Sequence, residues 1–192
     1  MQITYRNEVY RKLIHLGSLS MPIGYHLFGK IPSIIIISFA LLVSLYIDLS
    51  RIYSLPGKQF LINLIGPVLR EHEFERLGGA FYILLAGLIA IIFLDVPTAA
   101  AAMGFVIVGD VAAALTGRRW GETRLPGTRK SLEGSIGCLL ACILVAYVAP
   151  GVPFIVGLAG AVVATIAEAY SGVIDDNIAV VIASGLVMYL AG

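Results

Sequence analysis

The stretch that decides the fold is Pro97-Thr-Ala-Ala-Ala-Ala-Met-Gly-Phe-Val-Ile-Val-Gly-Asp110-Val-Ala-Ala-Ala-Leu-Thr116, an apolar run that holds one carboxylate. Its length falls within the about 17–25 residues that a helix needs to cross the hydrocarbon of a bilayer. A carboxylate without a partner inside such a run costs roughly 2.5–3.5 kcal/mol. The run therefore predicts a buried helix in which Asp110 faces a cation, another partner or a wet cavity.

Six further apolar runs have a similar length, at residues 13–29, 31–47, 78–94, 132–149, 151–171 and roughly 176–191. The chain is 59% hydrophobic and only 13% charged, whereas a soluble domain carries roughly 25% charged residues. We therefore predict an all-α fold, a polytopic integral membrane helical bundle of about seven transmembrane helices. Residues 1–192 then form a single membrane-embedded domain.

The charged residues gather on one side when these runs are threaded in alternating directions. An excess of lysine and arginine marks the cytoplasmic side, which places the connection with Arg118, Arg119, Arg124, Arg129 and Lys130 inside. The N-terminus, the 50–77 connection and the turn at 175–177 are then inside too, and only Lys30 and Asp95 lie outside. We expect the C-terminus outside and a site on the cytoplasmic face.

The N-terminal segment is polar and has no cleavage pattern, so we expect the first run to stay attached. The short loops favour a prokaryotic cell membrane as the location.

Within 53–77, apolar residues from Phe60 to Leu69 recur at helical spacing. This pattern predicts an amphipathic helix in the interface plane, interrupted near Pro67. The charged tail at 70–76 would flank the next run, with a solvated juxtamembrane helix as the alternative.

Small residues at helical spacing favour close helix contact in two runs, with Gly109, Ala113 and Gly117 in one and Gly157, Gly160 and Ala164 in the other. Cys138 and Cys142 lie four residues apart on one helix face, with no histidine or carboxylate beside them. We interpret them as small apolar packing residues.

Acidic residues lie at the inner ends of two further runs. Glu168 is near the end of one, and Asp175 and Asp176 follow after a break at Gly172. With Asp110 they supply the hard oxygen ligands that Mg²⁺ prefers when it is shared with phosphates. The alternatives are that Asp110 pairs with an arginine for folding, and that Asp176 or Asn177 caps the last helix.

A polar stripe enters the first run, because Glu8, Arg11, Lys12 and His15 fall at positions i, i+3, i+4 and i+7. Snorkelling to the headgroups explains Arg11 and Lys12. It does not explain His15, which lies about a turn deeper and makes either a structural hydrogen bond or a contact in the site.

A glycine-rich basic loop, residues 117–135, runs into the start of the fifth apolar run. Free backbone N–H groups and the positive end of a helix dipole would suit it to bind phosphate, with added charge from Arg129 and Lys130. It is not a Walker loop, because Gly127 and Lys130 are too far apart and no strand precedes them. Glu133 in the first helical turn would be a metal ligand or would orient Lys130. The basic patch is too short, and too poor in aromatic residues, for nucleic acid.

These segments resemble the polyprenol (dolichol) kinase, phytol kinase and CTP-dependent diacylglycerol kinase family. The most specific element is Lys130-Ser-Leu-Glu-Gly-Ser135. The resemblance is further carried by Glu8-Val-Tyr-Arg-Lys-Leu-Ile-His15, Arg76-Leu-Gly-Gly-Ala-Phe-Tyr82, Asp110 with Gly117-Arg118, Pro126-Gly127, Glu168 and Asp175-Asp-Asn177.

The resemblance implies phosphoryl transfer from a nucleoside triphosphate, typically CTP, to the hydroxyl of a membrane lipid alcohol. The acceptor would be an isoprenoid alcohol of the polyprenol, dolichol, phytol or geranylgeraniol type, or diacylglycerol. The whole chain would then be a catalytic core with Mg²⁺ or another divalent cation as cofactor. Its partners would be the lipid alcohol, the nucleotide and membrane lipids, with no nucleic acid; a homo-oligomer is compatible with the sequence.

The residues and the resemblance together predict four groups in the site. The catalytic group is Asp110, Lys130, Glu133 and Glu168. The nucleotide-binding group is Arg118, Gly127, Thr128, Arg129, Lys130, Ser131 and Gly134. The metal ligands are drawn from Asp110, Glu168, Asp175 and Asp176, and the accessory polar group is Arg11, Lys12, His15 and Asn177.

Three other functions are weighed against this one. An enzyme similar to CTP:phosphatidate cytidylyltransferase would use the same nucleotide and metal but would release pyrophosphate. A CDP-alcohol phosphotransferase is disfavoured, because no further aspartate pair follows Asp110-Val-Ala-Ala113 on the helix. A small transporter would carry a polar site near the midplane and internal duplication, and the sequence shows neither. The sequence does not distinguish CTP from ATP, nor one lipid alcohol from another.

Overall fold

The computed structural model describes residues 5–66, 75–172 and 174–192, and within these ranges the regular structure is helical, with one isolated bridge between Arg124 and Ser131. The elements are α1 (Tyr5–Leu16), the 3₁₀ helix η1 (Gly17–Leu19), α2 (Ser20–Phe28), α3 (Lys30–Tyr53), α4 (Lys58–Ile65), α5 (Gly79–Phe93), α6 (Val96–Trp120), α7 (Leu132–Val148), α8 (Phe154–Tyr170) and α9 (Asp176–Ala191). The all-α prediction is confirmed.

Each predicted apolar run lies on helical structure. The first is carried by α1, η1 and α2 in succession, and the others by α3, α5, α6, α7, α8 and α9. By length and composition, α3 and α6 are long and apolar enough to cross a membrane, with 24 and 25 residues. The apolar helices α5, α7, α8 and α9 are shorter, with 15, 17, 17 and 16 residues. Two helices are thus candidate spans, and the crossing of a membrane by seven helices stays a prediction.

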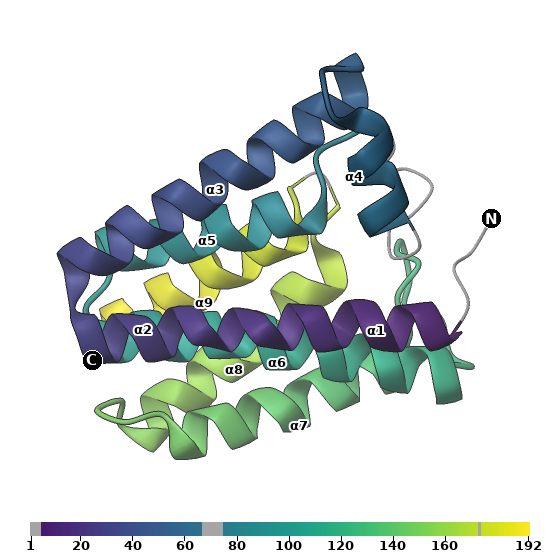
Figure 1. The fold of residues 1–192 in the computed structure, drawn as a ribbon. Coiled ribbons are helices and arrows are strands. Elements are labelled where there is room, and N and C mark those ends of the chain that lie inside the picture. The colour runs from purple at the N-terminus through teal and green to yellow at the C-terminus, as the bar shows by residue number, and fades with distance from the viewer. Residues whose placement is uncertain (1–4, 67–74, 173) are drawn as a thin grey trace.

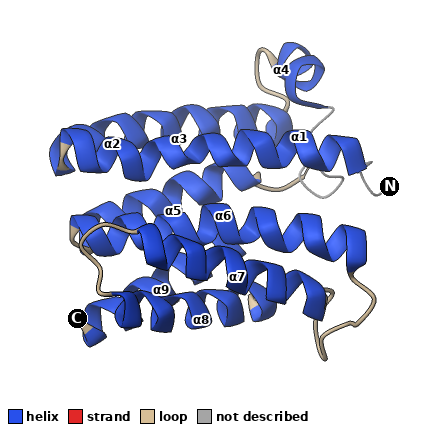
Figure 2. Ribbon diagram, turned by 90° about the horizontal axis from the view of Figure 1, so that it is seen from below, coloured by secondary structure: helices blue, strands red, loops and turns tan. Residues whose placement is uncertain are grey.

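The helices of the bundle run along a common direction and alternate in sense (Figure 1). The turns before α3, before α6 and before α8 lie at one end, together with the C-terminus. The start of α1, the loop between α6 and α7, and the start of α9 lie at the other end, which we call the charged end (Figures 1 and 2). The charge pattern thus predicted correctly which connections share an end of the bundle.

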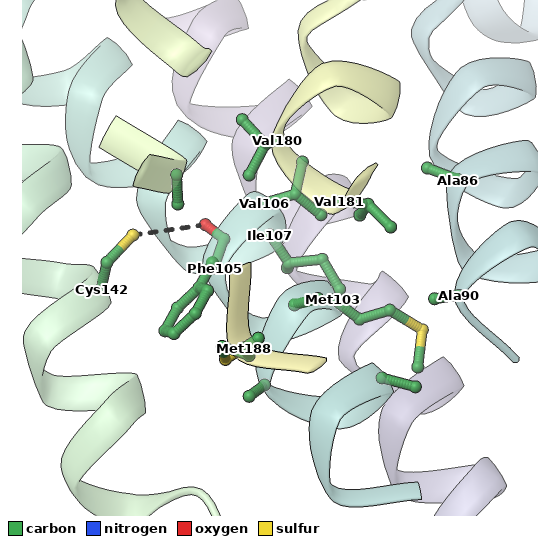
Figure 3. Packing of buried hydrophobic residues seen from close by; sticks show 14 of the residues in the cluster. Ala86, Ala90, Met103, Phe105, Val106, Ile107, Cys142, Val180, Val181 and Met188 are labelled. Carbon is green, nitrogen blue, oxygen red and sulfur yellow. Dashed lines mark hydrogen bonds between the residues drawn. The ribbon is translucent and has the colours of Figure 1, made fainter. Parts of the chain in front are cut away.

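The core is built around α6, which packs against α7, α9, α2, α8, α1 and α5. Its Met103, Phe105 and Ile107 are almost wholly buried, and Figure 3 shows them beside residues of α5 and α9. The thiol of Cys142 donates to the carbonyl oxygen of Phe105, with 3.7 Å between sulfur and oxygen (Figure 3).

Close approach of α6 and α7 depends on glycine. A β-carbon at Gly109 would lie 2.8 Å from the sulfur of Cys142 and 3.0 Å from that of Cys138. Both cysteines are free and buried against α6. The packing roles predicted for the glycine and for the two cysteines are therefore confirmed.

Side chains fix where three helices begin. Asp95 accepts a hydrogen bond from the N–H of Thr98 at the start of α6, and Ser131 accepts one from Gly134 at the start of α7. Asp175 caps α9. Each cap satisfies an N–H that the helix itself leaves unpaired, and two of the three caps lie at the charged end.

The helix predicted within 53–77 is present as α4, which stands apart from the bundle near the charged end (Figure 2). It has eight residues, and Phe60 on it is 70% exposed. The predicted interruption near Pro67 and most of the charged tail, residues 70–74, lie outside the described residues.

The helices of the first two apolar runs, α1 with α2 and then α3, separate toward the charged end. α2 packs on both α3 and α6, whereas α1 packs on α6. From the turn at Gly29, whose φ of 78° suits glycine, α1 and α3 therefore diverge, as Figure 1 shows. Residues of α1, η1 and α3 line the cleft described below.

Candidate active site

A cleft of about 1610 Å³ opens at the charged end between α1, α3, α5, α6, the start of α7, α8 and the start of α9. It is larger than the roughly 300–1,000 Å³ of an ordinary small-molecule pocket. Most of the predicted site residues line it, namely Arg11, His15, Asp110, Arg118, Arg129, Lys130, Ser131, Gly134, Glu168, Asp175, Asp176 and Asn177. The fold thus brings together residues that are as much as 166 positions apart, from Arg11 to Asn177.

Three carboxylates converge in this cleft from three different helices. One oxygen from each of Asp110, Glu168 and Asp176 lies within 4.8 Å of the other two. The side chain of Glu168 is only 4% exposed, and its Oε2 has no hydrogen-bond partner among the residues that the structure describes. A buried carboxylate oxygen without a donor is costly, and a set of hard oxygen atoms at this spacing fits a divalent cation such as Mg²⁺.

Lys130 contacts two of the three carboxylates. Its ammonium donates hydrogen bonds to Glu168 and, over 3.1 Å, to Oδ2 of Asp176. Burial lowers the pKa of Lys130, but the negative charges of Asp176 and Glu168 outweigh burial and raise that pKa above its ordinary value. Lys130 is therefore an ammonium at any physiological pH.

The third carboxylate, Asp110, is met by the polar stripe on α1. The ammonium of Lys12 donates to Oδ2 of Asp110, and Nε2 of His15 lies 3.4 Å from the same oxygen. Lys12 is 2% exposed. The cation that pairs with Asp110 is thus Lys12 and not the arginine considered in the sequence analysis. His15 lies against the same carboxylate.

Two further ion pairs join α1 to the end of α6 through Glu8. Glu8, which is 1% exposed, accepts from Nη2 of Arg11 over 2.5 Å. Its other carboxylate oxygen lies 3.6 Å from Nη1 of Arg118 at the end of α6. Glu8 therefore links α1 to α6 beside Asp110.

The loop between α6 and α7 folds on itself. The N–H of Lys130 donates to the hydroxyl of Thr128, and the N–H of Thr128 donates to the carbonyl of Leu125. The expectation of free backbone N–H groups is therefore wrong for Thr128 and Lys130. Gly127, with φ of 75°, forms the turn of this loop, and neither it nor Thr128 lines the cleft. The residues of this loop that line the cleft are Gly121, Arg124, Arg129, Lys130 and Ser131.

Glu133 has a different contact from the one predicted. It is half-buried in the first turn of α7, and its Oε1 accepts from the N–H of Thr123 over 3.1 Å. It does not line the cleft. In this structure the carboxylate of Glu133 therefore contacts the loop and not Lys130, and a role of Glu133 in metal binding or catalysis stays a prediction.

Gly134 lies where α6 and α7 come closest at the charged end. A β-carbon there would lie 3.0 Å from the carbonyl oxygen of Ala113 and 3.3 Å from Cα of Gly117. The two glycines let the backbones approach, and Ser131 caps the helix that begins there. This part of the motif places Lys130 beside α6.

Asp175 and Asp176 are adjacent but have separate roles. Oδ1 of Asp175 accepts from the backbone N–H of Asn177 over 3.0 Å and from its side-chain amide over 2.7 Å. Burial raises the pKa of Asp175, although the hydrogen bonds from Asn177 oppose the shift. Asp175 is therefore the helix cap that had been weighed for its neighbours, while Asp176 joins the carboxylate cluster.

A buried ion pair on α3 was missed by sequence reasoning. Arg51 and Asp48 are 3% and 4% exposed, and Nη2 of Arg51 lies 2.8 Å from Oδ1 of Asp48. Asp48 also accepts from the N–H of Gly78, and Arg51 donates to the carbonyl of Arg76. The pair thus holds the start of α5 against α3 at the cleft wall. The signal was present as an acid and a base at i and i+3, directly after the apolar run 31–47.

Fold and site together define an all-helical protein with a cleft at one end of the bundle, in which lysines lie against a cluster of three carboxylates. The chain is 32% identical over 148 residues to a probable phytol kinase, chloroplastic, of Triticum aestivum. The match covers 66% of this chain and 49% of that protein, so the chain spans about half the length of the curated relative. This similarity supports the resemblance to the phytol and polyprenol kinase family. No family model matches the chain, and no solved structure matches it significantly.

Proposed function

We propose that this chain is a membrane-embedded lipid-alcohol kinase that transfers a phosphoryl group, with CTP as donor, to an isoprenoid alcohol or diacylglycerol. The observation that carries the proposal is the convergence of Asp110, Glu168 and Asp176 with Lys130 in one open cleft. The name of the wheat relative supports the same class of reaction.

Exposed apolar side chains support insertion of the bundle in a membrane. Ile35 and Leu42 on α3, Leu140 on α7, Ile166 on α8 and Leu186 on α9 are each more than half exposed. Soluble monomers rarely expose apolar patches of more than a few hundred Å². In the proposed orientation the charged end faces the cytoplasm, because the basic loop lies there, and α4 lies in the interface.

Mg²⁺ would be held by Asp110, Glu168 and Asp176, whose oxygen atoms fit it in type and spacing. When bound, the ion neutralises charge that develops on the donor phosphates. Asp175 is left out of this set, because its oxygen is engaged by Asn177.

The positive side chains of the cleft wall would bind the nucleotide. Lys130, Arg129 and Arg118 would bind the triphosphate and stabilise the charge of the transition state. For Lys130 this requires that its ammonium, which now contacts Glu168 and Asp176, also reaches phosphate oxygens. An ammonium has three donors, so one can turn to the nucleotide while the others keep the carboxylates.

In the proposed reaction, the hydroxyl oxygen of the lipid alcohol attacks the terminal phosphorus of the nucleotide. The bond from that phosphorus to the bridging oxygen breaks, which yields a lipid monophosphate and a nucleoside diphosphate. Asp110 accepts the hydroxyl proton, because it faces α1 and the open side of the bundle whereas Glu168 is buried behind Lys130.

The test is turnover of the purified chain in lipid nanodiscs with terminally labelled CTP, labelled ATP and a panel of lipid alcohols. We expect labelled lipid monophosphate from CTP in the wild type, and loss of transfer in Asp110→Asn and Lys130→Ala. Release of pyrophosphate with a CDP-lipid product would instead identify a cytidylyltransferase-like enzyme. Unchanged transfer in both variants would overturn the site.

A further inference from the structure

We propose that the hydrocarbon chain of the acceptor lies in the apolar arm of the cleft, between α1 and α3, and enters it sideways from the bilayer. The apolar arm is the part of the cleft lined by Ile14, Ser18, Val43, Ser44, Ile47 and Ile83. This inference rests on the proposed function, since it names where that site takes its lipid.

One wall of the arm is a single face of α3. Ala40, Val43, Ser44 and Ile47 recur at spacings of three and four, which places them on one side of a helix. Together with Phe39 they extend over roughly 12 Å at 1.5 Å per residue. α5 packs along α3, whereas α1 packs on α6 and diverges from α3 toward the charged end.

The opposite wall comes from α1 and the short η1. Ile14 is 66% exposed and Val43 is 44% exposed, so both present apolar surface at the mouth. Ser18 and Ser44 are small, and Ser44 is buried. Such a groove fits a hydrocarbon chain, which needs apolar walls and no hydrogen-bond partners along its length.

The arm is continuous with the charged site, which commits it to a chain that ends in a polar group. Ile14 of the arm is followed directly by His15, and Nε2 of His15 lies 3.4 Å from Asp110. Both residues line the same cleft. A chain seated between Ile14 and Val43 would therefore deliver its terminal hydroxyl to the carboxylate proposed to accept its proton.

Photo-crosslinking tests the location without any need for turnover. The probe is a long-chain prenol with a diazirine in mid-chain, irradiated with the wild-type chain in nanodiscs without nucleotide. We expect labelled peptides to include residues 14–18 and 40–47. Excess unlabelled prenol should compete for these sites. Labelling confined to the outer faces of α7 and α8, without competition, would overturn the inference.

A pair of neighbouring substitutions tests the same arm by kinetics. Val43 lines the cleft and Leu42, its neighbour on α3, does not, although both are exposed. We expect Val43→Trp to raise KM for a long-chain prenol by about tenfold or more while KM for CTP stays unchanged. A short prenol that does not reach Val43 should be phosphorylated as before, and Leu42→Trp should behave like the wild type. Equal effects of the two substitutions would contradict the arm. A wild type that phosphorylates no alcohol would refute the proposed function, and the crosslinks would still test the arm.

Discussion

The ammonium of Lys130 donates a hydrogen bond to the carboxylate of Glu168, which lies 38 residues further along the chain. The contact joins the loop before α7 to the end of α8, and Asp176 at the start of α9 contacts the same ammonium. One cation therefore ties three elements together at the charged end. The residue proposed to meet the phosphates is also the residue that orders the carboxylates.

Lys130→Ala should lower the rate of phosphoryl transfer, and its effect should depend on whether Glu168 is present. We expect transfer to fall by roughly 10²–10³-fold, as when one charge-stabilising donor is removed from an active site. In a double-mutant cycle with Glu168→Gln, the losses should be strongly non-additive, because the two residues are in contact. The rates for the two single variants and the double variant are the measurement. Simple multiplication of the single effects would mean that the contact has no role in catalysis.

Substitution by asparagine should have little effect at Asp175 and a large effect at Asp176. Asp175→Asn keeps a good capping residue and should leave turnover within about threefold of the wild type. Asp176→Asn removes an oxygen ligand from the cluster and should raise the Mg²⁺ concentration for half-maximal turnover by about 10-fold or more. Titration of turnover with Mg²⁺ in both variants checks this. A larger effect at Asp175 would exchange the roles assigned here.

Much of the fold could be predicted from the sequence, because apolar length and loop charge constrain a bundle strongly. The run that contains Asp110 is the central helix, and the connections at Gly29, Asp95 and 150–153 share one end. What could not be predicted is how α1 and α3 diverge. That depends on α1 packing on α6 while α2 packs on both α3 and α6, and no local pattern shows it.

The site was predictable in its residue types but not in its pairings. Asp110, Glu168 and Lys130 stood out because charges near apolar runs need partners. Which partner each would take depends on tertiary contacts across 98 residues for Lys12 with Asp110. The contact of Glu133 with Thr123 was not predicted, because a carboxylate in a first helical turn can turn either inward or outward. The buried Asp48 was overlooked because it follows an apolar run, where a charge is ordinarily solvated.

Glu133 should matter through its hydrogen bond rather than its charge. Glu133→Gln keeps an oxygen that can accept from the N–H of Thr123 and should retain transfer within about threefold of the wild type. Glu133→Ala removes that acceptor and should loosen the closed loop. Its expected signature is a raised KM for CTP, measured beside Glu133→Gln. Inactivity of Glu133→Gln would restore a direct catalytic role.

The seam between α6 and α7 should be intolerant of a single added methyl group. At Gly137 a β-carbon would lie 2.4 Å from the hydroxyl oxygen of Thr116 and 3.0 Å from its Cβ. We expect Gly137→Ala to destabilise the bundle by about 1–3 kcal/mol, read as a lower Tm in detergent. Gly17→Ala is the matched control, because no atom of the described part of the chain lies within 4 Å of its added carbon. Equal Tm values for the two variants would show that the helices can separate at no cost.

The buried pair on α3 should be needed as a pair. Asp48→Ala leaves the guanidinium of Arg51 buried beside the cleft without its carboxylate, and also removes the acceptor for Gly78. Breaking a buried ion pair costs about 3–5 kcal/mol, so the single variant should show a large fall in Tm. The double variant Asp48→Ala with Arg51→Met carries no unpaired charge and should recover part of that loss. Because Arg51 also donates to the carbonyl of Arg76, recovery should be incomplete. A double variant less stable than Asp48→Ala would show that Arg51 stabilises the start of α5 independently of Asp48.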